Sequence, residues 1–195
     1  MRNYGTMGRQ DCSRQPVSWL IPAQLAKSYI PDNADLLAWQ HAGIQSVVNL
    51  LESYYEDVVT QEFRQGFTVL HSPIPDMCAP TLDQLQAIVE WIDREICEKK
   101  RVLVHCFAGI GRTGIILIAY LMYKGEAMHD ALNMVLKIGS EPQTQEQLDI
   151  LEEVSLRQKD TGTEEQKRHN LMNEQKQFKA GYVAIVGGPN VGKST

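Results

Sequence analysis

The sequence has no long hydrophobic run, few cysteines and no excess of positive charge. Its longest apolar stretch, residues 115–123, has nine residues, about half of the roughly 18–20 that cross a bilayer. Residues 1–16 lack the apolar core of a secretion signal, so we expect a cytoplasmic protein. A net charge of −5 gives no electrostatic footprint for nucleic acid or an anionic membrane, and neither is expected as a partner.

The four cysteines, Cys12, Cys78, Cys97 and Cys106, show no paired metal-ligand spacing. A reducing compartment also argues against disulfides between them. With 43% apolar and 22% charged residues, the composition is that of a soluble folded protein. These properties exclude a membrane protein, a disulfide scaffold and a disordered chain, but they say nothing about chemistry.

Strand-like and helix-like segments alternate over most of the chain. We expect strands at residues 17–22, 44–51, 67–71 and 101–105, and helices at 33–41, 82–96, 112–123, 126–138 and 144–157. The longest of these helices begins with Thr81 and Gln84 at the spacing of a capping box. This alternation predicts an α/β fold with a central, mostly parallel sheet flanked by helices. Ligands of such folds bind beyond the carboxyl ends of the strands.

The composition changes near residue 157. Residues 158–180 contain no valine or isoleucine and read as a solvated linker. We therefore divide the chain into an N-terminal extension (1–16), a folded domain (17–157), this linker and a last segment (181–195).

The segment that follows the predicted strand 101–105 carries the clearest chemical pattern. It runs from His105 and Cys106 through two glycines, Gly109 and Gly111, to Arg112. A turn from strand to helix directs successive backbone N–H groups into one concavity, and glycine permits the sharp turn and a close approach. Arg112 can clamp two oxygens of an anion with its planar guanidinium. The pattern predicts a cradle for phosphate, in which His105 orients the loop.

Cys106 lies at the base of this cradle. Amide dipoles and a nearby guanidinium both favour its thiolate, which is a nucleophile for phosphoryl transfer. The alternative is a small buried hydrophobic residue, the usual role of a lone cysteine at the end of a strand. The fixed order of strand, cysteine, glycines, arginine and helix start favours the nucleophile.

Residues 105–114 match the HCxxGxxR(S/T)G signature of the cysteine-dependent protein tyrosine phosphatases. Residues 17–157 as a whole resemble the small atypical dual-specificity phosphatases. The resemblance implies a phosphatase that forms a cysteinyl-phosphate intermediate. It also implies a phosphate-binding loop of Phe107, Ala108, Gly109, Ile110, Gly111 and Arg112.

A phosphatase of this kind needs a proton donor for the departing oxygen. Asp76 is the best candidate, because it lies in a proline-rich loop between a strand and the long helix, where the family places its acid. The alternative is a simple turn residue beside proline. Asp83 and Asp93 are weaker candidates, since both lie on the predicted helix.

Two further residues follow from the resemblance. Thr113 can donate a hydrogen bond to the sulfur of Cys106, or it is an ordinary residue of the first helical turn. Gln147 lies where the family often has a glutamine that orients the attacking water, although Thr144 and Gln147 also have the spacing of a capping box. The expected cycle needs neither a metal nor another cofactor, because arginine and amides supply the positive charge.

The variable loop positions, Phe107, Ala108 and Ile110, are not basic. Phosphatases of this family that act on inositol phosphates or lipids tend to carry lysines there. We therefore expect a singly phosphorylated protein or small phosphomonoester as substrate, with phosphotyrosine accepted and phosphoserine or phosphothreonine accepted more weakly. A binding module that recognises phosphorylated partners without turnover is the competing hypothesis.

A second glycine-rich motif lies at residues 187–194. Gly187, Gly192, Lys193 and Ser194 satisfy the P-loop pattern after an apolar strand. Residues 181–195 resemble the start of Era-like GTPases, but no magnesium-binding or base-reading motif follows within the sequence. We expect nucleotide binding only if a full GTPase domain is present, and otherwise an appendage without function in this chain.

Overall fold

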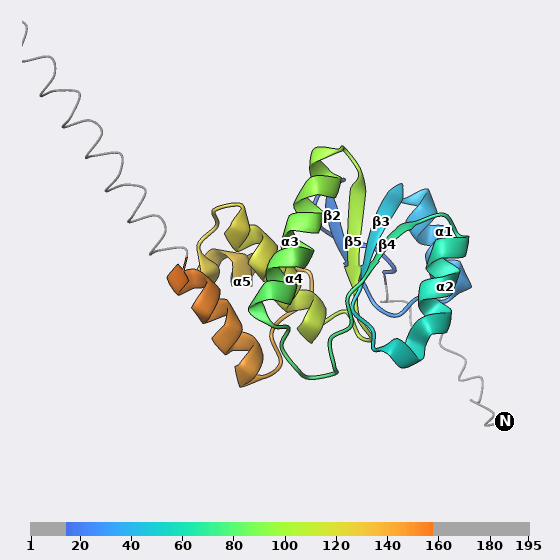
Figure 1. Ribbon diagram of the computed structural model, residues 1–195. Helices are drawn as coiled ribbons and strands as arrows, with labels where there is room; N and C mark the ends of the chain where they lie inside the picture. The colour runs from blue at the N-terminus through green and yellow to red at the C-terminus, as the bar shows by residue number, and fades with distance from the viewer. Residues whose placement is uncertain (1–14, 158–195) are drawn as a thin grey trace, which may run out of the picture. The chain divides into compact units, whose positions relative to one another are not determined.

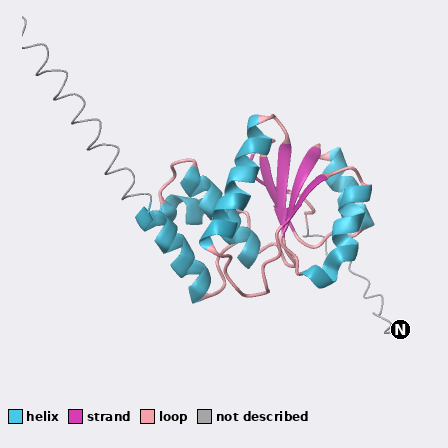
Figure 2. Ribbon diagram, viewed as in Figure 1, coloured by secondary structure: helices cyan, strands magenta, loops and turns pink. Residues whose placement is uncertain are grey.

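The computed structural model describes residues 15–157, in which helices cover both faces of a five-stranded sheet (Figures 1 and 2). The strand order is β1-β2-β5-β3-β4, with β1 antiparallel to β2 and the other three pairings parallel. This confirms the predicted α/β class with a mostly parallel sheet. The strands are β1 (Ser18–Ile21), β2 (Leu25–Ser28), β3 (Ile44–Asn49), β4 (Thr68–His71) and β5 (Arg101–His105).

The helices pack on the two faces of the sheet in unequal groups (Figure 1). Helices α1 (Asn33–His41) and α2 (Glu56–Arg64) cover one face, where Trp39 of α1 belongs to a small buried core. The other face carries the larger core, built by α3 (Leu82–Cys97), α4 (Gly111–Tyr123), α5 (Met128–Lys137) and a helix over residues 145–157. The α4 helix is buried over almost its whole length, as its apolar sequence predicts.

Three elements were not predicted: β2, α2 and the short 3-10 helix Ser53–Tyr55 that precedes α2. Strand β2 has four residues and includes a lysine, Lys27, so its apolar pattern is too short to detect. Helix α2 buries the charged residue Glu62 beside Val59, which breaks the apolar period that sequence analysis relies on.

The start of α3 confirms half of the predicted capping box. Thr81 Oγ1 accepts a hydrogen bond from the Gln84 amide at 3.2 Å. The Gln84 side chain does not return to Thr81; it donates to Ser72 Oγ and to the Pro73 carbonyl, both at 3.0 Å. The glutamine thus connects the helix to the loop that carries Asp76.

The parallel strands end together at one edge of the sheet. Ser28 and Asn49 both pair with His105, the last residue of β5, and Asn49 also pairs with His71. The loops that follow these strands therefore meet at the same place. In Figure 1 they lie at the lower end of the sheet.

The chain divides into two units, Met1–Val154 and Ser155–Thr195, and the sheet belongs to the first. The P-loop motif at residues 187–194 lies outside the described residues. Within the described part of the chain, no helix is both long and apolar enough to span a bilayer.

Candidate active site

The loop after β5 packs closely against the end of β2. Cys106 is 2% exposed, and its Sγ accepts a hydrogen bond from the Gly109 amide at 3.3 Å. Gly109 has a φ of 70°, and a Cβ at this position would lie 2.2 Å from the Ser28 carbonyl oxygen. Only glycine fits both the left-handed backbone and this close approach. The chain thus turns back over the sulfur and directs an amide toward it.

The carbonyl groups of the same loop are held by residues around it. The Phe107 carbonyl accepts from the Ile30 amide at 3.0 Å. The Gly109 carbonyl accepts from Lys27 Nζ at 3.0 Å and from Ser140 Oγ at 2.6 Å. Because a peptide unit's N–H and C=O point in opposite directions, these contacts leave the neighbouring amides free to face the other way.

A buried polar chain supports the loop from the other side. His105 and Glu62 are both fully buried, with Nε2 and Oε1 2.7 Å apart, although the approach is off-axis for a hydrogen bond. The second oxygen of Glu62 accepts from Asn49 Nδ2 at 2.9 Å, and Asn49 Oδ1 accepts from the Leu51 amide at 2.9 Å. These contacts hold Glu62 in place next to His105, the residue that precedes Cys106.

Arg112, in the first turn of α4, has a buried guanidinium with three partners. Nη1 donates to Glu52 Oε2 at 2.8 Å and to the Ile74 carbonyl at 2.9 Å, and Nη2 lies 2.9 Å from Asp76 Oδ1. Burial acts to lower the pKa of Arg112, but the Glu52 hydrogen bond and the charges of Cys106, Glu52 and Asp76 outweigh it and raise the pKa. The guanidinium is therefore charged and fixed in direction.

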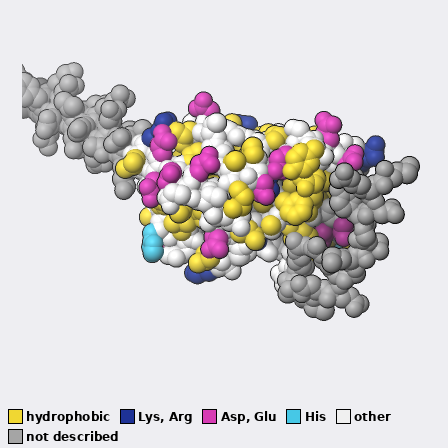
Figure 3. Space-filling view, turned by 90° about the horizontal axis from the view of Figure 1, so that it is seen from below, with side chains coloured by type: hydrophobic (Ala, Val, Ile, Leu, Met, Phe, Trp, Pro, Cys, Tyr) yellow, Lys and Arg dark blue, Asp and Glu magenta, His cyan; other side chains and the backbone are white. Residues whose placement is uncertain are grey.

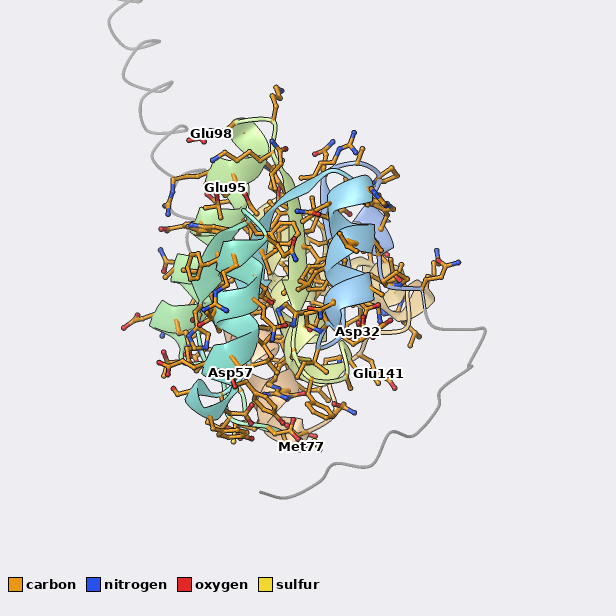
Figure 4. All side chains as sticks on the ribbon, turned by 90° about the vertical axis from the view of Figure 1, so that its right-hand side faces the viewer. Asp32, Asp57, Met77, Glu95, Glu98 and Glu141 are labelled. Carbon is orange, nitrogen blue, oxygen red and sulfur yellow. The ribbon has the colours of Figure 1, made fainter. Side chains whose placement is uncertain are left out.

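Asp76 stands at the tip of a tight turn. The Cys78 amide donates to the Pro75 carbonyl at 3.1 Å, and Met77 between them has a φ of 63°, a left-handed conformation that costs a non-glycine residue roughly 1–2 kcal/mol. The Asp76 side chain is 67% exposed. In Figure 4, Met77 lies at the end of the domain opposite Glu98.

Sequence analysis missed Glu52, which connects Arg112 to the loop that carries Asp76. We call this loop, residues 72–80, the acid loop. Besides its bond to Arg112, its Oε1 accepts from the Asp76 amide at 2.9 Å. Burial acts to raise the pKa of Glu52, yet the hydrogen bonds from its own backbone amide, Arg112 and the Asp76 amide, with the guanidinium charge, lower the pKa overall. Its place just beyond β3, at the carboxyl edge of the sheet, is the signal that could have identified it.

Gln147 is fully buried beneath the acid loop. Its Nε2 donates to the Cys78 carbonyl at 3.0 Å, and its Oε1 accepts from the Gln143 amide at 2.8 Å. Both ends of its amide are thus bound to the surrounding backbone. Thr144 Oγ1 also accepts from the Gln147 amide at 3.3 Å, the helix cap that the sequence offers as the alternative.

Two other side chains lie close to the phosphate-binding loop. Gln143, which the sequence analysis did not select, reaches the loop directly: a Cβ on Gly111 would lie 2.5 Å from its Oε1. Thr113 is fully buried, and its Oγ1 has no hydrogen-bond partner among the described residues. The rival aspartates lie on α3: Asp83 is exposed in its first turn, and Asp93 Oδ1 accepts from Lys124 and Tyr120.

Residues 24–126, just over half of the chain, match the sequence model of a family described as a polymorphic toxin system DSP-PTPase phosphatase. This chain belongs to that family. The chain is also similar to the solved structure of Tk-PTP in its active form. It is 34% identical with a TM-score of 0.66, and the similarity covers 73% of this chain and 97% of that one.

Curated relatives of this chain match over shorter segments. Human dual specificity protein phosphatase 9 is 29% identical over 53% of this chain and 27% of its own length. The phosphatidylglycerophosphate phosphatase PTPMT1 of Arabidopsis thaliana is 32% identical over 48% of this chain and 28% of its own. The chain thus spans only about a quarter of the length of these two relatives.

The rim of the candidate site is apolar and acidic. Tyr54, Met77 and Phe107 are 75%, 49% and 49% exposed. The ring of Tyr55 lies between two of them, with centroid distances of 4.5 Å to Tyr54 and 6.0 Å to Phe107. On the face seen in Figure 3, hydrophobic side chains gather into a patch with acidic side chains at its border. We call Tyr54, Tyr55 and Phe107 the aromatic rim.

Proposed function

We propose that this chain hydrolyses phosphate monoesters of protein side chains through a phosphorylated cysteine. The Cys106 thiolate attacks phosphorus, so that an S–P bond forms while the P–O bond to the substrate breaks. Asp76 donates its proton to the departing oxygen. Water then attacks the phosphocysteine, Asp76 takes up its proton, and the S–P bond breaks to release phosphate and restore the thiolate.

The observation that carries this proposal is the placement of Cys106 and Arg112 around one loop. The sulfur accepts an amide hydrogen bond from Gly109, and the guanidinium is buried, charged and held by Glu52. Donors fixed in this way can stabilise the charge that spreads over the phosphoryl oxygens in the transition state. The amides of residues 107–112 would bind those oxygens together with Arg112.

Three side chains are assigned supporting roles in the proposal. Thr113, whose buried hydroxyl has no described partner, would donate to the sulfur as it leaves phosphorus. Gln143, whose amide lies against Gly111, is better placed than Gln147 to position the attacking water. Gln147 would act indirectly: its hydrogen bond to the Cys78 carbonyl would hold the acid loop in place.

The aromatic rim supports phosphotyrosine as the preferred substrate, with phosphoserine and phosphothreonine accepted more weakly. An aryl phosphate can pack its ring against Tyr55 and Phe107, whereas a short alkyl phosphate cannot. The carboxylates of Glu52 and Asp76 would repel the additional phosphates of an inositol headgroup.

A Cys106→Ser substitution tests the proposal. With p-nitrophenyl phosphate, kcat should fall by at least about 1,000-fold, while Cys97→Ser, which changes an exposed cysteine on α3, should keep full activity. In acid-quenched wild type, mass spectrometry should find phosphate on Cys106. Turnover should be blocked by vanadate but not by EDTA. Binding of phosphopeptides without turnover or a phosphoenzyme would instead indicate a recognition module.

Substrate class is tested by matched rates on a phosphotyrosine peptide, its phosphothreonine analogue and a soluble phosphoinositide. A higher kcat/KM for the lipid headgroup would overturn the protein substrate and leave the chemistry of Cys106 intact. The P-loop motif at residues 187–194 is not part of this proposal. Its possible role is addressed separately by measuring GTP binding to the whole chain.

A further inference from the structure

Lys27 connects the strand next to β5 with the phosphate-binding loop. It lies on β2, where it pairs with Val104. Its Nζ donates to the Gly109 carbonyl at 3.0 Å and to the Gly139 carbonyl at 2.7 Å. One ammonium group therefore ties the loop to the segment between α5 and the helix at 145–157. Gly109 and Gly139 lie outside the strands and helices, so their carbonyl groups accept no hydrogen bond of a regular helix or sheet.

The amide and the carbonyl of Gly109 make hydrogen bonds with different partners. The Gly109 amide donates to Cys106 Sγ, whereas its carbonyl accepts from both Lys27 and Ser140. Because φ is +70° and the backbone lies against Ser28, rotation of this residue would require the loop to leave β2. The bonds from Lys27 and Ser140 favour the one orientation in which the loop carbonyl points away from the sulfur.

The positive charge of Lys27 also interacts electrostatically with Cys106. Burial lowers the pKa of the Lys27 ammonium below its ordinary value, and the negative charge of Cys106 opposes that effect. The cation is thus partly desolvated and close enough to interact with the thiolate, on the β2 side of the loop. Arg112 interacts with the same thiolate charge. Among the described residues, the charge of Arg112, unlike that of Lys27, is also paired with two carboxylates, those of Glu52 and Asp76.

We propose that Lys27 is a positioning residue of the phosphatase, which holds the Gly109 carbonyl out of the phosphate cradle and places a second fixed cation beside Cys106. This inference rests on the proposed function, since it assigns a role in the same loop. Lys27 does not touch the phosphate in this proposal. It acts through Gly109, with Ser140 as its neutral helper on the same carbonyl.

The test compares Lys27→Met with Lys27→Arg, which keeps the cation, and with Lys124→Met as the matched control. Lys124 is half-exposed and pairs with Asp93 at the far end of α4, so its substitution removes the same charge away from the loop. A misplacement of about 1 Å in an active site can lower the rate by about 100-fold. We expect Lys27→Met to lower kcat/KM by at least tenfold, Lys27→Arg to recover part of the loss, and Lys124→Met to match wild type.

Two readouts separate positioning from a loss of folding. At one fixed pH, Cys106 should be alkylated by iodoacetamide more slowly in Lys27→Met than in wild type, because the variant lacks a positive charge that stabilises the reactive thiolate. Binding of inorganic phosphate should weaken by a similar factor to kcat/KM. A Lys27→Met protein with a lower Tm but an unchanged alkylation rate and phosphate affinity would overturn the inference. The proposed function would stand in that case, since it is tested by the loss of activity in Cys106→Ser and not by the Lys27 variants.

Ser140→Ala gives an independent measure of the carbonyl contact. It removes the 2.6 Å hydrogen bond to Gly109 without changing the charge. We expect a smaller loss of kcat/KM than in Lys27→Met and no change in the rate of Cys106 alkylation. A decrease in that rate equal to the decrease in Lys27→Met would contradict the assignment of the charge effect to Lys27.

Discussion

The carboxylate of Asp76 is paired with the guanidinium of Arg112, with Oδ1 2.9 Å from Nη2. The proposed acid therefore occupies one side of the proposed phosphate clamp. A phosphate that binds Arg112 through the same nitrogen has to displace this carboxylate. Once displaced, Asp76 becomes available at the tip of its turn to protonate the departing oxygen. The pair thus couples phosphate binding to the placement of the acid.

Asp76→Asn should separate the two roles of this residue. Without the proton donor, kcat for phenyl phosphate should fall by roughly 100-fold or more, and the loss should be smaller for p-nitrophenyl phosphate, whose leaving group needs less protonation. Inorganic phosphate and vanadate should bind more tightly, because they no longer compete with a carboxylate for Arg112. Steady-state kinetics and inhibition constants give both values.

The control for this variant is Asp83→Asn, which changes an exposed aspartate in the first turn of α3 that has no role in the proposed cycle. Its kinetics should equal those of wild type. An equal loss for both leaving groups in Asp76→Asn would rule out Asp76 as the acid.

Glu52→Gln should destabilise the domain at neutral pH but not in acid. The pKa of Glu52 is lowered in the folded state from its ordinary value of 4.5. Its ionisation therefore stabilises the fold above about that pH, and this stability is lost as the pH falls through the folded-state value. We expect a loss of about 1–3 kcal/mol at pH 7, with the difference in Tm shrinking below about pH 4.

Thermal unfolding of both proteins across this pH range is the measurement. Glu98→Gln is a suitable control, because it removes an exposed pair with Lys100, and exposed pairs contribute little. A difference in Tm between Glu52→Gln and wild type that stays constant down to pH 3 would contradict the role given to the Glu52 charge.

Gly109→Ala should abolish the cradle, because a Cβ cannot lie 2.2 Å from the Ser28 carbonyl oxygen. We expect kcat/KM to fall by more than about 100-fold. Gly66→Ala is the matched control: it has a φ of 90°, but a Cβ there meets nothing within 4 Å. It should cost roughly 1–2 kcal/mol of stability through backbone strain alone. Activity retained in Gly109→Ala would show that the loop does not need this close packing.

Tyr55→Leu and Phe107→Leu should reduce the preference for phosphotyrosine. An aromatic pair contributes about 0.5–1.5 kcal/mol beyond its buried area, so kcat/KM for a phosphotyrosine peptide should fall by roughly twofold to tenfold. The rate on the phosphothreonine analogue should change little. Tyr123→Leu, which changes an exposed aromatic residue at the other end of α4, is the control. Parallel losses on both peptides would argue against a role for the rim in selectivity.

The sequence alone determined the fold class, most helices and strands, and the loop from Cys106 to Arg112. It could do so because these features are local: an apolar period, a glycine where the backbone turns, and a nucleophile and cation at fixed spacing. Asp76 was selected as a candidate from its proline-rich loop between a strand and the long helix and from the resemblance to the phosphatase family, and its role stays a prediction.

Only the tertiary structure showed that four further residues contact the site: Glu52, Lys27, Ser140 and Gln143. They come from three segments: Glu52 follows β3, Lys27 lies on β2, and Ser140 and Gln143 both lie between α5 and the helix at 145–157. Glu52 and Lys27 reach the loop because β2 and β3 each pair with β5 in parallel. Their contacts with Arg112, Gly109 and Gly111 depend on chain folding over tens of residues, which no local pattern encodes. The sequence names the groups that react, and the packing of distant segments sets the direction in which those groups point.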